Sequence, residues 1–189
     1  MSTDTPSANT PQNQRLVIHS NDDLPEVAPL LDQMADALCQ RFEQIGLNNI
    51  ALVGIHSGGV WIAEQLHQRL ELSEAMGTLD ISFYRDDYTR VGLNPSVKPS
   101  NLPFATESRH IVLVDDVIMS GRTIRAALNE LFDYGRPDSV TLVTLLDLPG
   151  RELPVQPDIT GQRLQLPEGI RIKLSADPLA LTLLEPKEA

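Results

Sequence analysis

The sequence is poor in the residues that build disulfide-rich and membrane proteins. It has a single cysteine, Cys39, in 189 residues, which excludes an intrachain disulfide framework and a zinc site made of several cysteines. Its apolar runs, such as Ile111–Val114, are far shorter than the roughly 20 residues that a membrane-spanning helix needs. Residues 1–14 show neither the basic start nor the apolar stretch of a signal peptide. We therefore expect a cytoplasmic protein with no membrane partner.

Basic residues are also scarce. There are 15 Lys and Arg against 26 Asp and Glu, which gives 15 − 26 = −11 with neutral histidines. This charge repels a phosphate backbone on average, so it argues against broad, non-specific nucleic-acid binding. A local basic patch is still compatible with it. His19, His67 and His110 are scattered along the chain without the spacing of metal ligands.

Length and composition predict one globular domain over residues 15–189, preceded by a disordered polar tail over residues 1–14. Apolar residues at steps of three and four predict helices over 22–45, 60–70 and 122–134. Pro29 points to a later start for the first of them. A long loop is expected over 85–108, and the part after Asp147 is broken into short pieces by proline.

Short apolar runs predict strands buried on both faces of a sheet over 50–55, 111–114 and 140–146. Alternating apolar and polar residues predict a further strand over 79–83, and a last strand is expected over 179–184. Strands that alternate with helices over short connections favour a mainly parallel sheet flanked by helices on both faces. The predicted fold class is therefore α/β.

One segment, IVLVDDVIMSGRT, carries a recognisable chemical pattern. Four apolar residues lead into two carboxylates, a short loop and a hydroxyl residue at a predicted helix start. Its residues are Ile111, Val112, Leu113, Val114, Asp115, Asp116, Val117, Ile118, Met119, Ser120, Gly121, Arg122 and Thr123.

This pattern suits a ribose 5-phosphate. In an open α/β sheet, ligands bind at the carboxyl ends of the strands. The free amides and positive dipole end of the following helix favour a phosphate group around Met119–Thr123, where Gly121 allows close approach. Asp115 and Asp116, a few residues upstream, can accept hydrogen bonds from sugar hydroxyls.

The segment has two other interpretations. An apolar strand that ends in Asp-Asp also resembles a Walker B strand, but that interpretation needs a phosphate-binding loop with lysine. The nearest candidate, Gly54–Gly59, is followed by Val60 and Trp61 where Lys and Ser or Thr should stand. Paired acidic residues at a strand end also occur as plain solvated turn residues. The length of the whole segment argues against that second interpretation.

The segment resembles the signature with which type I phosphoribosyltransferases bind 5-phosphoribosyl 1-diphosphate (PRPP). Within that family, further segments resemble the pyrimidine operon regulator/uracil phosphoribosyltransferase branch, the PyrR proteins. These segments are Asp80–Asp87, Arg122–Leu128 with Gly135–Pro137, and Asp147 with Arg151–Pro154. The resemblance covers roughly residues 16–185. It implies the type I phosphoribosyltransferase fold, with a small hood region formed near the C-terminus.

The resemblance implies an enzyme that converts uracil and PRPP to UMP and diphosphate and also regulates pyrimidine biosynthesis. In the PyrR branch this regulation works through attenuation at pyr leader RNA. The implied ligands are PRPP, uracil, UMP and UTP. Mg²⁺ would arrive with PRPP rather than on protein ligands of its own. Homodimers or homotetramers are implied as well.

Two further loops receive roles from the resemblance. The turn His56, Ser57, Gly58 and Gly59 would contact the diphosphate of PRPP, although PyrR-like sequences carry arginines here in a pattern like Arg-Thr-Arg-Gly. Its amides can still form an anion nest, and His56 has the plain alternative of filling a turn. The missing arginines leave a second hypothesis open, a non-catalytic regulator that senses nucleotides or PRPP.

The other loop begins with Arg85, Asp86 and Asp87. The resemblance implies that it closes over PRPP and that Arg85 reaches the diphosphate. Exclusion of water protects the oxocarbenium-like ribose carbon from hydrolysis. The alternative is a solvated charge cluster.

Overall fold

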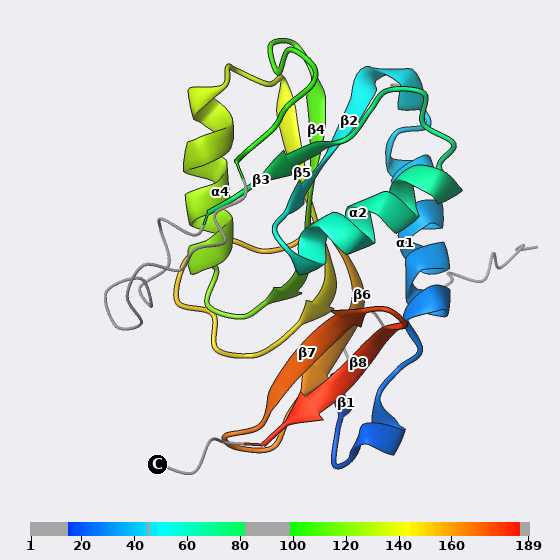
Figure 1. Ribbon diagram of the computed structural model, residues 1–189, viewed down its shortest axis with the longest axis vertical. Coiled ribbons are helices and arrows are strands. Elements are labelled where there is room, and N and C mark those ends of the chain that lie inside the picture. The colour runs from blue at the N-terminus through cyan, green and yellow to red at the C-terminus, as the bar shows by residue number, and fades with distance from the viewer. Residues whose placement is uncertain (1–14, 45, 82–98, 186–189) are drawn as a thin grey trace, which may run out of the picture.

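The computed structural model describes residues 15–44, 46–81 and 99–185. The tail expected over residues 1–14 therefore lies outside the described residues. At the centre is a six-stranded sheet with the order β1-β6-β5-β4-β2-β3 (Figure 1). All its strand pairs are parallel. The strands are β1 (Leu16–Val17), β2 (Ile50–Ile55), β3 (Gly77–Leu79), β4 (His110–Ile118), β5 (Ser139–Asp147) and β6 (Ile159–Gln165).

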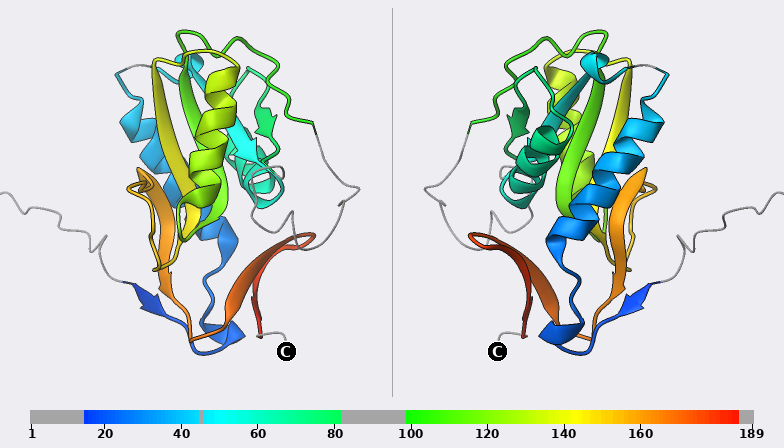
Figure 2. Two further views of the ribbon diagram at one scale, coloured as in Figure 1. Left: turned by 90° about the vertical axis from the view of Figure 1, so that its left-hand side faces the viewer. Right: turned by 90° about the vertical axis from the view of Figure 1, so that its right-hand side faces the viewer.

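Helices cover both faces of this sheet (Figure 2). Helices α1 (Val27–Arg41) and α2 (Gly58–Arg69) pack on one face, and α4 (Arg122–Asp133) packs on the other. Two short 3-10 helices, η1 (Asn21–Asp23) and η2 (Leu47–Asn49), flank α1 along the chain. The layered α/β architecture predicted from the alternation of strands and helices is confirmed.

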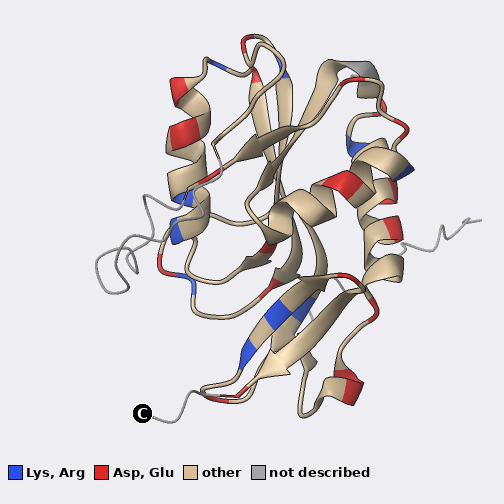
Figure 3. Ribbon diagram, in the orientation of Figure 1, with Lys and Arg blue, Asp and Glu red and all other residues tan. Residues whose placement is uncertain are grey.

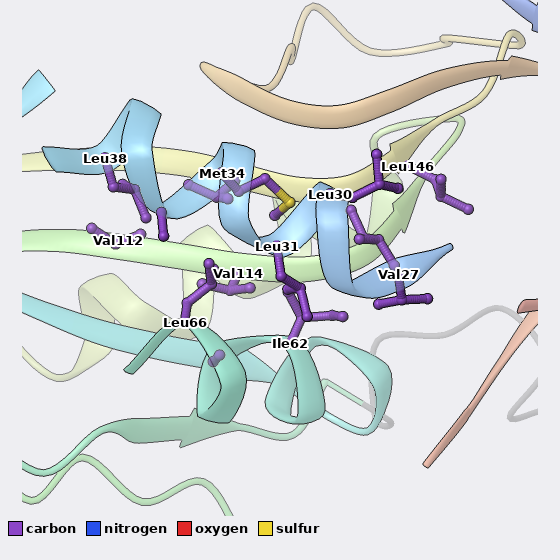
Figure 4. Packing of buried hydrophobic residues seen from close by; sticks show 14 of the residues in the cluster. Val27, Leu30, Leu31, Met34, Leu38, Ile62, Leu66, Val112, Val114 and Leu146 are labelled. Atoms are coloured by element: carbon purple, nitrogen blue, oxygen red, sulfur yellow. The ribbon is translucent and has the colours of Figure 1, made fainter. Parts of the chain in front are cut away.

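Alternating side chains of the buried strands supply the two halves of the core. Val112 and Val114 of β4 point toward α1 and α2, whereas Ile111 and Leu113 point toward α4. Figure 4 shows the first half, in which Leu31 of α1 is 1% exposed among side chains of α2 and the sheet. Full burial of such a side chain stabilises a protein by about 1.5–3 kcal/mol.

A separate antiparallel hairpin covers the edge of the sheet where the strands end. Its strands are β7 (Arg171–Ala176) and β8 (Leu179–Leu184), and it lies beyond the arrow ends of the sheet strands (Figure 1). Leu174 is 3% exposed and joins the core under α1 and α2. The amide of Leu183 donates a hydrogen bond of 2.8 Å to Oδ1 of Asn21. This hairpin corresponds to the hood that the family resemblance implied.

The start of α1 differs from the prediction. Ser20 and Asp23 form a capping box on η1. Helix α1 begins at Val27 instead of residue 22, with Pro29 in its first turn, as the later start indicated by Pro29 requires. Oδ2 of Asp23 accepts hydrogen bonds of 2.9 Å from the amides of His19 and Ser20. These bonds, that from His19 first, stabilise the ionised carboxylate and hold the pKa of Asp23 below its usual value.

The strands also differ in places. Strand β4 continues through Asp115 and Asp116 to Ile118 instead of ending at Val114. Strand β3 lies at Gly77–Leu79, so it starts two residues before the predicted 79–83, of which residues 82 and 83 lie outside the described residues. Strands β1, β6 and β7 were not predicted. Across the three described ranges, no helix combines the length and hydropathy needed to cross a membrane.

Candidate functional site

The two carboxylates of the motif lie near the carboxyl end of β4, in the middle of the sheet. Asp115 pairs in register with Thr144 of β5, and Ile118 pairs with Asp147. Figure 3 colours acidic positions near the arrow end of β4, on the side of the sheet where the β7–β8 hairpin lies. The pattern had predicted that both carboxylates follow the strand. They are instead part of it, so the sheet fixes their backbone.

Asp115 and Asp116 have different environments because successive side chains of a strand point to opposite faces. Asp115 is 5% exposed, and its Oδ1 accepts a hydrogen bond of 3.0 Å from the amide of Asp116. Asp116 is half-buried, and its Oδ1 accepts one of 3.0 Å from the amide of Val117. Asp116 is therefore the more accessible of the two to a ligand.

The loop between β4 and α4 turns tightly at Gly121 into the first turn of α4. Gly121 has φ +89° and caps α4, a left-handed conformation that glycine adopts without steric penalty. Ser120 Oγ accepts a hydrogen bond of 3.3 Å from the amide of Arg122. Thr123 lies half-buried in the first turn of α4. The free amides of a helix start attract an anion, and this start directly follows the carboxylates.

The turn at residues 56–59 adjoins the same carboxylates. The peptide bond between His56 and Ser57 is cis, and α2 begins at Gly58. His56 is half-buried and Ser57 is exposed, whereas Gly58 and Gly59 are buried. A Cβ atom at position 58 would overlap the carboxylate of Asp116 and would lie 2.8 Å from its Cβ.

This close approach gives a physical reason for glycine at position 58. Any larger residue, arginine included, would have to displace the side chain of Asp116 in this conformation. The structure therefore brings together the 56–59 turn, the two aspartates and the 119–123 loop. Arg85, Asp86 and Asp87 lie outside the described residues.

A cluster of charged residues beside the motif was not recognised as such from the sequence. The carboxylate of Asp147, 5% exposed, lies 2.8 Å from Nη2 of Arg151, 3.4 Å from Nε of Arg163 and 3.8 Å from Nη2 of Arg15. Arg15 also donates a hydrogen bond of 2.9 Å to the backbone carbonyl of Asp147. Asp147 and Arg151 entered the prediction only through the family resemblance. The pairing of β1, β6 and β5 brings Arg15 and Arg163 close to Asp147 and Arg151. No local sequence pattern predicts this pairing.

The described part of the chain contains no group of three His, Cys, Asp or Glu side chains that could hold a metal ion. Asp115 and Asp116 offer the hard oxygen ligands that Mg²⁺ prefers. Their carboxylates would hold such an ion together with the oxygen ligands that a phosphate-bearing substrate brings.

Comparison with known proteins agrees with this geometry. The phosphoribosyl transferase domain family matches residues 20–170. "Bifunctional protein PyrR" of Pseudomonas paraeruginosa is 59% identical over 159 residues, covering 84% of this chain and 94% of the relative. The protein of the same name from Pseudomonas fluorescens is 54% identical over 161 residues, covering 85% and 96%.

Solved structures show the same fold at low identity. A hypoxanthine phosphoribosyltransferase from Staphylococcus aureus superposes with a TM-score of 0.63 at 20% identity, covering 88% of this chain and 94% of the other. That of Trypanosoma cruzi gives 0.64 at 17% identity, covering 92% and 98%. These structures share the fold, and the family model and the sequence relatives establish that the chain belongs to the PyrR family of phosphoribosyltransferases.

Proposed function

We propose that this protein transfers the phosphoribosyl group of PRPP to uracil, forming UMP and diphosphate. The observation that carries the proposal is the convergence of three elements at one sheet edge: the aspartates of β4, the amide loop at Gly121 and the glycine turn at Gly58. Such a site offers hydrogen-bond acceptors for a sugar between two positions for anions. PRPP carries a ribose between two phosphate groups.

In this proposal each segment holds one part of PRPP. Asp115 and Asp116 accept hydrogen bonds from the ribose hydroxyls, and the amides of Met119–Thr123 receive the 5-phosphate. The 56–59 turn contacts the diphosphate, and the loop starting at Arg85 supplies further charge. When bound with PRPP, Mg²⁺ would supply positive charge against the leaving diphosphate.

The reaction needs positioning more than covalent help from the protein. The bond from C1 of ribose to the diphosphate oxygen breaks, a bond from C1 to N1 of uracil forms, and the N1 proton is released. Positive charge develops on the ribose ring as diphosphate leaves. Carboxylates fixed near the ring stabilise it without reorganising during the step.

The direct experiment follows radiolabelled uracil with PRPP and Mg²⁺ and measures UMP. We expect turnover in the ordinary enzyme range of about 1–1000 s⁻¹. The competing proposal is a non-catalytic regulator that senses UMP, UTP or PRPP in the same pocket, and the missing arginines at positions 56 and 58 favour it. UMP binding without UMP formation would select the regulator.

We also propose that pyr leader RNA binds to the basic surface formed by Arg15, Arg151 and Arg163. The guanidinium groups of these three arginines lie 2.8–3.8 Å from the carboxylate of Asp147. A local cluster of arginines can contact phosphates even in a protein whose overall charge is negative. A gel shift against pyr leader RNA over a salt series tests the proposal, and an absence of salt-dependent binding would remove it.

The proposed oligomer is a homodimer or homotetramer in the cytoplasm, as the family resemblance implies. Light scattering of the purified chain distinguishes these states from the 20.8 kDa monomer. Fractionation of cells that produce the chain tests the location.

A further inference from the structure

The segment that follows β5 runs along the loop proposed to receive the 5-phosphate. We call Asp147–Val155 the strap and Ile118–Gly121 the phosphate loop. Leu153, Arg151 and Val155 of the strap would all lie 3.5–3.7 Å from a Cβ atom at Gly121, so the strap covers one side of the loop.

Three successive carbonyl oxygens of the phosphate loop accept hydrogen bonds from the strap. The oxygen of Ile118 accepts from the amide of Leu148 (2.9 Å), that of Met119 from Nη1 of Arg151 (2.9 Å), and that of Ser120 from the amides of Glu152 (3.0 Å) and Leu153 (3.1 Å). Every peptide oxygen from Ile118 to Ser120 therefore points toward the strap.

Because the carbonyl oxygens face the strap, the direction of the following N–H groups is fixed as well. In a planar trans peptide, the C=O and the N–H of the next residue point in opposite directions. The amides of Met119, Ser120 and Gly121 consequently point away from the strap, toward the side of the loop left for an anion. An outward-turned carbonyl oxygen at this place would repel a phosphate group.

Only one of these four hydrogen bonds comes from a side chain. The guanidinium of Arg151 holds the Met119 carbonyl with Nη1, and with Nη2 it holds Oδ1 of Asp147 at 2.8 Å. Asp147 is 5% exposed and is held in turn by Arg15 and Arg163. Because Asp147 is fixed, it orients the guanidinium group of Arg151 toward the phosphate loop. Met119 is 53% exposed, so packing of its own side chain restrains this peptide little.

We propose that Arg151, oriented by Asp147, is a positioning residue for the 5-phosphate: it keeps the Met119–Ser120 peptide turned so that its N–H faces the phosphate. This inference deepens the proposed function and rests on it. Without the guanidinium, the Met119 carbonyl loses a charge-assisted hydrogen bond and the peptide can rotate. Arg151 itself needs no contact with the substrate.

The test compares a ligand that has the 5-phosphate with one that lacks it. Calorimetry measures the affinity of wild type, Arg151→Met and Arg151→Lys for UMP and for uridine. We expect Arg151→Met to bind UMP about tenfold more weakly, equivalent to about 1.4 kcal/mol, with a change below about twofold for uridine. Arg151→Lys should recover part of the loss, because one ammonium donates to Met119 or Asp147 but lacks the fork that spans both.

Arg41→Met is the matched control. Arg41 of α1 pairs with Asp158 at 2.8 Å, on an ion pair that involves neither the strap nor the phosphate loop. We expect it to bind both ligands like wild type.

In steady-state kinetics, Arg151→Met should raise KM for PRPP more than KM for uracil.

An equal fall in UMP and uridine affinity in Arg151→Met would mean a general structural role and would overturn the inference. Wild-type turnover of uracil in the same preparation would then still support the proposed function. Conversely, absence of UMP formation by the wild-type protein would contradict the proposed enzyme activity. A loss of affinity confined to UMP in Arg151→Met would still support the positioning role. Equal affinity of wild type for UMP and uridine would contradict the inference directly.

Discussion

Gly58 and Asp116 occupy adjoining space at the start of α2, and this contact makes a prediction for single residues. Gly58→Ala places a Cβ atom against the Asp116 carboxylate, which must rotate away from the hydrogen bond it accepts from the Val117 amide. Loss of a hydrogen bond to a charged group costs about 1.5–3 kcal/mol. We expect UMP affinity, measured by calorimetry, to fall about tenfold or more. Unchanged affinity would show that Asp116 moves without consequence for the ligand.

The control for this variant is Gly46→Ala. Gly46 has φ +84° and no atom within 4 Å of a Cβ placed there, and it lies between α1 and η2 rather than at the site. Alanine is strained in that conformation, so thermal stability should fall while UMP affinity stays at the wild-type value. The pair of variants separates a lost binding contact from a lost fold.

A second prediction concerns the proposed ribose contact. Asp116→Asn keeps the shape of the side chain but replaces one acceptor oxygen by a donor. We expect the preference for UMP over its 2′-deoxy form to shrink by about tenfold, because a charge-assisted hydrogen bond is worth about 1.5–3 kcal/mol. Binding of both nucleotides is measured by calorimetry. An undiminished preference would show that Asp116 does not contact the 2′-hydroxyl.

At the scale of elements, α1 is held by its buried face rather than by its exposed charges. Leu31→Ala removes a side chain that is 1% exposed, and such truncations cost about 2–5 kcal/mol. Asp32→Ala, at the next position, breaks a pair with Arg69 in which the Asp32 side chain is 68% exposed and should cost less than about 1 kcal/mol. Urea unfolding compares the two variants. Similar losses would contradict this account of α1.

The elements also show what the sequence can predict. The continuous apolar run of β2 predicted its bounds, 50–55, and β5 extends one residue beyond the predicted 140–146 at each end. Both strands are buried on two faces, so nearly every position must be apolar and the apolar run marks the strand. Strand β6 was missed because only Leu164 of its residues is buried and Gly161 interrupts it. β4 was predicted too short because the apolar run ends at Asp115 while the pairing with β5 continues.

The candidate site also has a part that the sequence predicts and a part that it does not. Its contiguous part, Asp115–Thr123, could be located from the sequence because strand, loop and helix start follow one another along the chain. The arginines around Asp147 could not, since Arg15 and Arg163 are 148 residues apart, 163 − 15 = 148, and meet only when β1 pairs with β6. Sequence patterns report neighbours along the chain, and the sheet decides which strand ends become neighbours in space.

For the whole molecule, the question is whether the net charge of −11 or the local arrangement of charge controls RNA binding. The double variant Arg15→Gln/Arg163→Gln removes two guanidinium groups beside Asp147 and takes the net charge to −11 − 2 = −13. Arg41→Gln/Arg69→Gln makes the same change in net charge at the pairs with Asp158 and Asp32. The two double variants therefore lose the same charge at different places, one beside the buried carboxylate of Asp147 and the other at the more exposed pairs of Arg41 and Arg69.

If RNA binds at the Asp147 cluster, only Arg15→Gln/Arg163→Gln should weaken binding to pyr leader RNA. Each lost phosphate contact lowers the slope of log affinity against log salt concentration by about 0.7–0.9, so the slope should fall by about 1.4–1.8 when both arginines contact phosphate. Gel shifts over a salt series measure both quantities. Equal weakening in the two double variants would mean that overall charge governs the encounter, because a long-range field is insensitive to which surface arginine is removed. A difference between them would show that an acidic protein can still bind a polyanion through arginines that only the folded sheet brings together.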